Sequence, residues 1–348
     1  MLPCLTISRL SIDEKTYHGL LFVREMSHGY RKLRLKLNIT LTAMLKSRHT
    51  NAHPLLKIVE WLMIMLACTL IVFGAWYMLP VDHASTGSLL LFQALQAVAV
   101  FIIPALAVAY LWSDQPLQWL HIRAGDQSGL QRSTLDVQLS LLSIGIIVTA
   151  IPLINCLVSW NRMITLPDSL SSLEQLMQQL EEQAERLLEG FLTYRDGAWW
   201  MLVVNLFVLA LLPAIGEELA FRGVLQSLIS GGRSGIRSHV AVWVTAFVFS
   251  FVHFQFYGFI PRLLLGALLG YALAWSGRIG HSIIMHATNN ALSVIVFYLG
   301  IYVLNYSQAE IDALGTDHTW WLTLVCTPAM AGLMYLYYRR SRSLQKRN

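Results

Sequence analysis

Two adjacent glutamates inside a long apolar stretch are the residues of this chain that most clearly suggest chemistry. Between Asp196 and Glu310 the sequence has only two carboxylates, Glu217 and Glu218. An acid within a membrane helix costs at least ~2.5–3.5 kcal/mol on insertion scales, so such acids usually face the protein interior and serve a function. Arg222 follows Glu218 by four residues, so the two can pair on one helix face, either for packing alone or to support a site. Glu217 points about 100° away and is left for another partner.

Two histidines and an asparagine occupy the apolar stretches that follow. His253 comes four residues after Phe249, and Asn290 comes four residues after His286. The members of each pair therefore share one helix face. Each pair alone is a weak signal, because a single histidine among aromatic residues is usually a packed core residue.

Helix geometry predicts that Glu217 and His253 lie at the same depth. With a short cytoplasmic loop at residues 231–238, they are 13 and 15 residues from it, which corresponds to ~20 and ~22 Å. His286 is 7 residues from its own cytoplasmic turn, or ~10 Å, a difference that helix tilt can absorb. We therefore expect one polar chamber that opens toward the cytoplasmic half of the bilayer.

These residue types are sufficient for a hydrolytic site. A carboxylate beside a histidine can take a proton from water, and burial next to Glu218 makes Glu217 a stronger base. The Asn290 amide and a His286 N–H can stabilise the oxyanion that forms when this water attacks an amide carbonyl. Glu217, His253 and His286 could instead hold a zinc ion with one position open for water.

The composition indicates that membrane helices carry these residues. Apolar residues make up 55% of the 348 residues and charged residues 13%, against about 45–50% and 25% in soluble domains. This excludes a soluble globule and a disordered chain. We expect an all-α polytopic membrane protein with about eight transmembrane helices of about 20 residues, a catalytic core in the fourth to seventh, and a kink at Pro213. The expected spans are 58–80, 88–112, 136–158, 198–230, 239–256, 259–277, 280–304 and 319–339.

The distribution of basic residues predicts that both termini are cytoplasmic. Of the 25 Lys and Arg, ten lie before residue 58 and five lie after residue 338. If each span reverses the side, only four basic residues fall outside, as the positive-inside rule requires: Arg162, Arg186, Arg195 and Arg262. The pattern predicts a multi-pass protein of a bacterial cytoplasmic membrane, with basic ends that face anionic lipid rather than nucleic acid.

The same pattern divides the chain into segments. Residues 1–57 form a basic cytoplasmic tail that need not belong to the fold, 58–339 the membrane domain, and 340–348 a second basic cytoplasmic tail. Within the membrane domain, 159–197 carries leucines at near-helical spacing and predicts an external amphipathic connector without chemistry. The four cysteines contain no CxxC pair and are interpreted as packing residues rather than a disulfide framework or a zinc site.

The motifs resemble those of the CAAX-protease and bacteriocin-processing (CPBP, or Abi) family of intramembrane endopeptidases, which includes the type II CAAX prenyl endopeptidases. The family signatures are Glu-Glu-x-x-x-Arg, Phe-x-x-x-His and His-x-x-x-Asn on successive core helices. They occur here in order at 217–222, 249–253 and 286–290, and the glycine that follows the first motif, Gly223, also fits. The resemblance covers residues 198–304, under a third of the chain.

The resemblance implies an endopeptidase that cuts a peptide bond near the cytoplasmic membrane face. It implies that Glu217 activates water with the help of His253, while His286 and Asn290 polarise the scissile carbonyl and the neighbouring ion pair supports the first helix. Members are labelled metalloproteases, but a metal-free glutamate mechanism is also argued. We favour no cofactor, with a divalent metal such as zinc as the alternative. The implied partners are the lipid bilayer and a peptide or membrane-protein substrate, which in CAAX processing is prenylated.

Two other functions stay open. The first is a non-catalytic membrane protein of the same fold, such as a bacteriocin self-immunity or scaffold protein, although every motif position is intact. The second is a proton-coupled carrier that uses Glu217, His253 and His286 as a relay, although the inverted repeats typical of carriers are not seen. Other protease classes fit poorly: there is no HExxH zinc helix, and the rhomboid-like residues 232–235 fall outside the apolar spans.

Overall fold

The computed structural model describes residues 49–50, 52–122, 130–193, 199–231, 236–307 and 313–345. The chain divides into two units, Met1–Ala52 and His53–Asn348, and the fold below is that of the second unit. Most of the tail predicted at 1–57 and the last three residues of the tail predicted at 340–348 lie outside the described residues.

The described part of this unit is all-α. Its α-helices are α2 (Pro54–Met78), α3 (Thr86–Gln96), α4 (Ile103–Trp112), α5 (Pro116–Trp119), α6 (Leu130–Arg162), α7 (Ser171–Leu192), α8 (Trp199–Asn205), α9 (Leu212–Glu217), α10 (Ser227–Ser230), α11 (Ile236–Phe251), α12 (Phe259–Ser276), α13 (Ile279–Tyr298) and α15 (Trp320–Gln345). Several continuous spans also contain π-helical stretches, namely η1 (Ala97–Ile102), η4 (Leu206–Leu211), η5 (Glu218–Gln226) and η6 (Leu299–Val303).

Helices occur at all eight predicted spans, but the described residues contain six that are long and apolar enough to cross a membrane. These six are Pro54–Met78, Thr86–Trp112, Ser133–Arg162, Trp199–Ser230, Phe259–Ser276 and Ile279–Val303. The spans predicted at 239–256 and 319–339 correspond to α11 and α15, which are not among the six. α11 has 16 residues, fewer than the about 20 that a full span needs.

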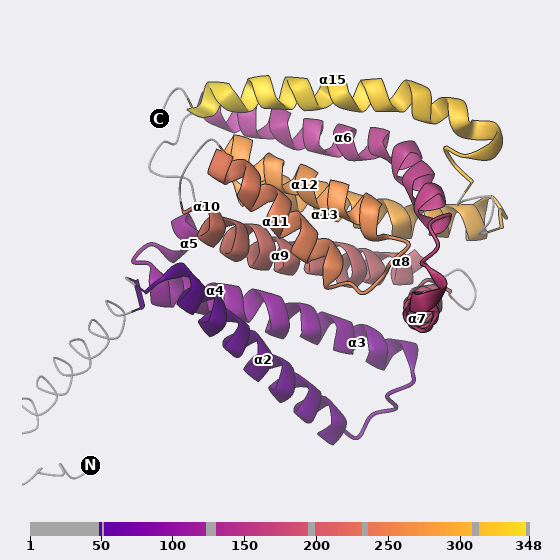
Figure 1. Ribbon diagram of the computed structural model, residues 1–348, viewed down its shortest axis with the longest axis horizontal. Coiled ribbons are helices and arrows are strands. Elements are labelled where there is room, and N and C mark those ends of the chain that lie inside the picture. The colour runs from indigo at the N-terminus through magenta and orange to yellow at the C-terminus, as the bar shows by residue number, and fades with distance from the viewer. Residues whose placement is uncertain are drawn as a thin grey trace, which may run out of the picture. The chain divides into compact units, whose positions relative to one another are not determined.

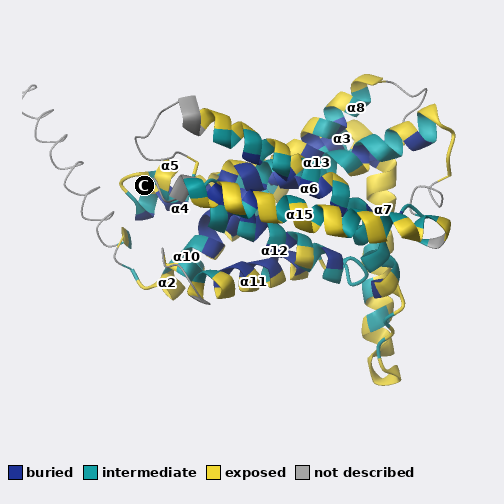
Figure 2. Cartoon of the chain, turned by 90° about the horizontal axis from the view of Figure 1, so that it is seen from above, coloured by how far each residue is buried: buried dark blue, intermediate teal, exposed yellow. Residues whose placement is uncertain are grey.

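The helices form a layered bundle. α6 and α15 pack along each other, and α6 also contacts α12 and α13 (Figure 1). α2, α3 and α4 lie on the other side of the span made by α8, η4, α9, η5 and α10 (Figure 1). Buried residues face the inside of the bundle and exposed ones cover its outer faces (Figure 2), as expected for helices that present apolar side chains to lipid.

α7 lies crosswise to the bundle helices at one end (Figures 1 and 2). This end also contains the C-terminal end of α6 and residues 252–258 between α11 and α12, and we call it the α7 end. The segment predicted as an amphipathic helix therefore does form one, and leucines such as Leu173, Leu176 and Leu187 are exposed on it.

Two of the four π-helical stretches, η1 and η4, end just before a proline. η1 ends at Ile102, two residues before Pro104, and η4 ends at Leu211, two residues before Pro213. Proline lacks an N–H, and its ring clashes with the carbonyl four residues earlier, which here lies inside the π-helical stretch. The local distortion expected at Pro213 therefore takes the form of a wider helical turn.

Two glycines let α12 pack closely on α11. A Cβ at Gly266 would lie 3.2 Å from Cα of Ala246, and one at Gly270 would lie 3.0 Å from a methyl carbon of Val242. Glycines four residues apart form a flat helix face, which lets two membrane helices approach. This close approach brings the α12 backbone within reach of the buried polar side chains of η5.

Candidate active site

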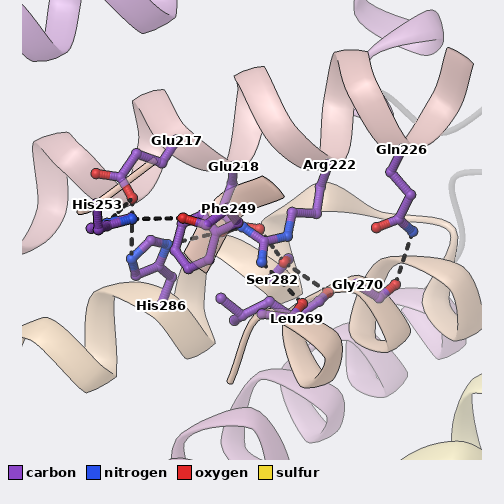
Figure 3. Close-up of polar contacts among 11 residues, drawn as sticks. Glu217, Glu218, Arg222, Gln226, Phe249, His253, Leu269, Gly270, Ser282 and His286 are labelled. Atoms are coloured by element: carbon purple, nitrogen blue, oxygen red, sulfur yellow. Dashed lines mark hydrogen bonds and ion pairs between the residues drawn. The ribbon is translucent and has the colours of Figure 1, made fainter. Parts of the chain in front are cut away.

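The Glu218–Arg222 pair is present as the sequence predicts, and it is completely buried. Nη1 of Arg222 lies 2.7 Å from Oε1 of Glu218, and both side chains have 0% exposure (Figure 3). Nη2 of Arg222 donates to the Gly266 carbonyl at 3.0 Å. The guanidinium also lies over the Phe249 ring, 4.4 Å from its centroid, a favourable cation–π contact at a fully buried position. Phe249, which belongs to the second motif, thus stabilises the Arg222 cation of the first motif.

The Glu218 carboxylate accepts hydrogen bonds at both oxygens. Oε1 accepts hydrogen bonds from Nη1 of Arg222 and from Nδ1 of His286, the latter at 2.8 Å. Oε2 accepts a hydrogen bond from the hydroxyl of Ser282 (Figure 3). A buried carboxylate with three donors is held ionised and oriented. Glu218 is therefore suited to position its neighbours rather than to bind a further group.

The contact with Glu218 fixes the tautomer of His286. An ionised carboxylate only accepts hydrogen bonds, so Nδ1 of His286 carries a proton. The other ring nitrogen, Nε2, lies 3.8 Å from Oε2 of Glu217. In the neutral ring this Nε2 is a proton acceptor, and it gains an N–H only when the ring is an imidazolium.

His253 is held in the same way but does not lie in a helix. α11 ends at Phe251, so the predicted span 239–256 was too long and His253 is in the loop that follows, where Phe254 has a positive φ of 53°. Nδ1 of His253 contacts the Phe249 carbonyl at 2.6 Å, and because a carbonyl only accepts, Nδ1 carries the proton. Nε2 lies 4.0 Å from Oε2 of Glu217.

Glu217 is the group on which both histidines converge. Their Nε2 atoms lie 3.8 and 4.0 Å from the same oxygen, Oε2, and the Glu217 side chain is 16% exposed. Both separations exceed a direct hydrogen bond and fall in the range that one bridging water can span. The three groups therefore surround a position suited to a polarised water molecule.

Asn290 lies one turn after His286 on α13, as predicted, and is half-buried. Its side-chain oxygen accepts a hydrogen bond from Nδ2 of Asn289 at 3.3 Å. That bond leaves the Asn290 NH₂ group as a potential donor. The side chains that lie within 4.0 Å of the Glu217 carboxylate are those of the two histidines.

The alternative zinc set is the same three residues, Glu217, His253 and His286. Among the side chains that the structure describes, no group of three or more His, Cys, Asp or Glu residues is arranged to hold a metal ion. The ring nitrogens that face Glu217 are nevertheless the type of donor that zinc accepts. Cys68, Cys156 and Cys326 are free thiols.

Ser282 is a site residue that the motifs do not contain. It is fully buried on α13 and donates to Glu218, with the Leu269 carbonyl 3.0 Å away (Figure 3). Its position one helical turn before His286 was a usable signal, since residues four apart share a face. Arg222 and Gln226 donate to the backbone carbonyls of Gly266 and Gly270 on α12. A sequence does not reveal backbone acceptors, and only the Gly-x-x-x-Gly spacing indicates this contact.

The loop that carries His253 is held by distant helices. Nδ2 of Asn161 at the end of α6 donates to the Phe256 carbonyl at 2.8 Å. The Tyr257 N–H donates to Glu181 of α7 at 2.9 Å, and Gln178 of α7 donates to the Tyr257 hydroxyl at 3.0 Å. Burial raises the pKa of Glu181, and the Tyr257 N–H partly opposes that rise. α7, predicted as a connector, therefore contributes to the position of His253.

Comparison with known proteins identifies one family. Residues 199–292 match the family described as type II CAAX prenyl endopeptidase Rce1-like. No curated protein and no solved structure matches the chain. The matched segment runs from α8 into α13 and includes Glu217, His253 and His286. This match over residues 199–292 confirms the resemblance based on the three motifs.

Proposed function

We propose that this chain is an intramembrane endopeptidase in which Glu217 activates water. The observation that carries the proposal is the convergence of two Nε2 atoms, from His253 and His286, on one oxygen of a mostly buried carboxylate. Both rings have their Nδ1 proton engaged elsewhere, so both present a proton acceptor to the same position. Such an arrangement supports removal of a proton from water.

In the proposed reaction, water bound beside Glu217 attacks the carbonyl carbon of the scissile peptide bond. The new carbon–oxygen bond forms as Glu217 takes a proton from the water, assisted by His253, and the carbonyl oxygen becomes an oxyanion. Collapse of this intermediate breaks the carbon–nitrogen bond, and the proton passes to the leaving amine. One water is consumed, and a new carboxylate and a new amine are released.

The tautomers divide the remaining roles between His286 and Asn290. The Asn290 amide is a donor in every protonation state, so we assign it the oxyanion. His286 donates from Nε2 only as an imidazolium, so it assists the oxyanion after the proton taken from water has passed to it from Glu217, whose Oε2 lies 3.8 Å from this nitrogen. Glu218 and Arg222 keep His286 and the η5 helix in place through their contacts.

Cavities near the site lie toward the α7 end. One of about 280 Å³ between α6, α7 and α13 is lined by Asn289 and Ser293 next to the motif, and one of about 480 Å³ shares Leu188, Leu192 and Phe297 with it. The mainly apolar lining of the smaller cavity suits an apolar segment of a peptide or membrane protein, including a prenylated one, whereas the larger cavity is also lined by Arg162, Glu185 and Glu189. We therefore propose that substrate enters from the α7 end, opposite to the cytoplasmic opening that residue depth predicts.

The deciding experiment compares peptide termini in membranes that contain the wild-type protein, Glu217→Gln, or Glu182→Gln, at matched expression. Glu182 is an exposed α7 residue paired with Arg186 and controls for the Glu→Gln change itself. New peptide ends are expected with wild type and Glu182→Gln and not with Glu217→Gln. If all three membranes give the same termini while the proteins are folded, the non-catalytic immunity or scaffold alternative replaces this proposal.

A further inference from the structure

Arg262 is a cation beside the proposed site that has no ion-pair partner among the described residues. In that part of the chain the other arginines at least partly buried against helices, Arg222 and Arg278, contact Glu218 and Asp136. Arg262 is half-buried near the start of α12, and one terminal nitrogen, Nη2, donates to the side chain of Gln255. The other terminal nitrogen, Nη1, is buried and has no hydrogen-bond partner.

The guanidinium lies against the loop that carries His253. A Cβ at Gly258 would come within 2.8 Å of Nη2 and 3.4 Å of Nη1, so the glycine leaves the space that the guanidinium occupies. The charge of Arg262 interacts with those of Glu217 and Glu181, although neither carboxylate is within ion-pair distance. Arg262 therefore lies against the loop that joins His253 to the α7 contacts of Tyr257, with Nη1 unused.

An unpaired guanidinium at this position is unfavourable for the empty protein. A buried donor without a partner and a charge without a contacting counter-ion both cost free energy, and charged residues in membrane proteins usually mark a functional path. A carboxylate is the ligand that best satisfies both, because it supplies the charge and an acceptor for the Nη1 proton.

We propose that Nη1 of Arg262 binds a carboxylate of the peptide substrate, which makes Arg262 a specificity-determining residue. This inference rests on the proposed function, because that function is the reason for taking the ligand to be a peptide. The carboxylate can be a free C-terminus or an Asp or Glu side chain near the scissile bond. Because this charge exists before the reaction starts, Arg262 acts on substrate binding rather than on the oxyanion.

A binding experiment tests this without requiring turnover. The full chain with Glu217→Gln is placed in phospholipid nanodiscs and titrated with three fluorescent tetrapeptide probes. They are Ala-Val-Ile-Leu with a free carboxylate, Ala-Val-Ile-Leu amide and Ala-Val-Ile-Asp amide. We expect the free acid to bind about tenfold to hundredfold more tightly than the Leu amide, as for a hydrogen bond between charged groups. If the Asp amide binds like the acid, a side-chain carboxylate also serves; if it binds like the Leu amide, the ligand is the terminus.

Three further variants in the same background separate charge from loop structure. Arg262→Gln should reduce the acid-to-amide preference to about one, and Arg262→Lys should retain part of it, since the charge is kept but the fork geometry is lost. Gln255→Ala removes the loop contact of Nη2 and should retain the preference. Equal binding of acid and amide, or a preference that survives Arg262→Gln, overturns the proposal. Neither result bears on cleavage by wild type, which the comparison of peptide termini decides.

Discussion

His286 bridges the two adjacent glutamates: its Nδ1 lies 2.8 Å from Oε1 of Glu218, and its Nε2 lies 3.8 Å from Oε2 of Glu217. Neighbouring residues on a helix point about 100° apart, and one imidazole ring spans the gap between them. The two glutamates of one sequence motif therefore have different surroundings and different roles. Glu218 is saturated by donors, whereas Glu217 faces two proton acceptors.

Replacing each glutamate by glutamine should therefore give different results. Glu218→Gln leaves the buried Arg222 without its counter-ion, and breaking such a pair costs about 3–5 kcal/mol of the free energy of unfolding. Glu217→Gln breaks no direct ion pair and should change stability by less than about 1 kcal/mol. Thermal unfolding of the two purified variants measures this. Equal stability of the two would mean that the pair does not hold the helix.

The oxyanion assignment predicts a kinetic effect for Asn290. Asn290→Ala removes a donor that acts mainly on the transition state, so kcat should fall by about 10²–10³-fold with little change in KM. Thr288→Ala is the matched control, because it removes a neighbouring polar side chain on the same helix, whose hydroxyl donates to the Ile284 carbonyl. Steady-state cleavage of a substrate found by the terminus comparison gives both constants. Similar losses of kcat in the two variants would exclude a special role for Asn290.

The motifs and the matching depths of Glu217 and His253 were enough to predict that Glu217, His253 and His286 lie together, although the four-residue spacing of Phe249 and His253 does not place those two on one helix. They did not show that α11 ends at Phe251, because that end depends on bonds to residues far away in the chain. Asn161, for example, is 95 residues from the carbonyl that it binds. The unused nitrogen of Arg262 was equally invisible, since the absence of a partner is a property of the packed structure.

A metal-free mechanism predicts that chelators leave the activity intact. We expect purified protein to keep its cleavage rate after treatment with 1,10-phenanthroline, and its zinc content to be well below one atom per chain. Loss of activity that zinc restores would instead support the ligand set Glu217, His253 and His286. In that case all three single substitutions should also abolish zinc binding, which distinguishes a site metal from one bound elsewhere.

The half-buried carboxyl of Glu181 predicts a pH dependence of stability. Its pKa is raised by burial above the ordinary value of about 4.3, so the folded state favours the protonated form. The stability that this form contributes is present at low pH and is lost as pH rises through the raised pKa. Glu181→Gln keeps an acceptor for the Tyr257 N–H without the charge. The variant should therefore be more stable than wild type at pH 7, and the difference should disappear near pH 4, as thermal unfolding at both pH values can show.

The positive-inside pattern predicts the orientation of the α7 end, and this decides where the proposed substrate enters. Gln175 on α7 and Arg237 at the start of α11 are both exposed, and they lie at opposite ends of the bundle. In a variant without native cysteines, Gln175→Cys should react with a membrane-impermeant maleimide in intact cells, whereas Arg237→Cys should react only after permeabilisation. This result would place α7 outside, so that a peptide entering there comes from the non-cytoplasmic side. The reverse labelling would put the α7 end in the cytoplasm. The loop that carries His253 would then lie on the cytoplasmic side too, because it is bound to α7 through Tyr257.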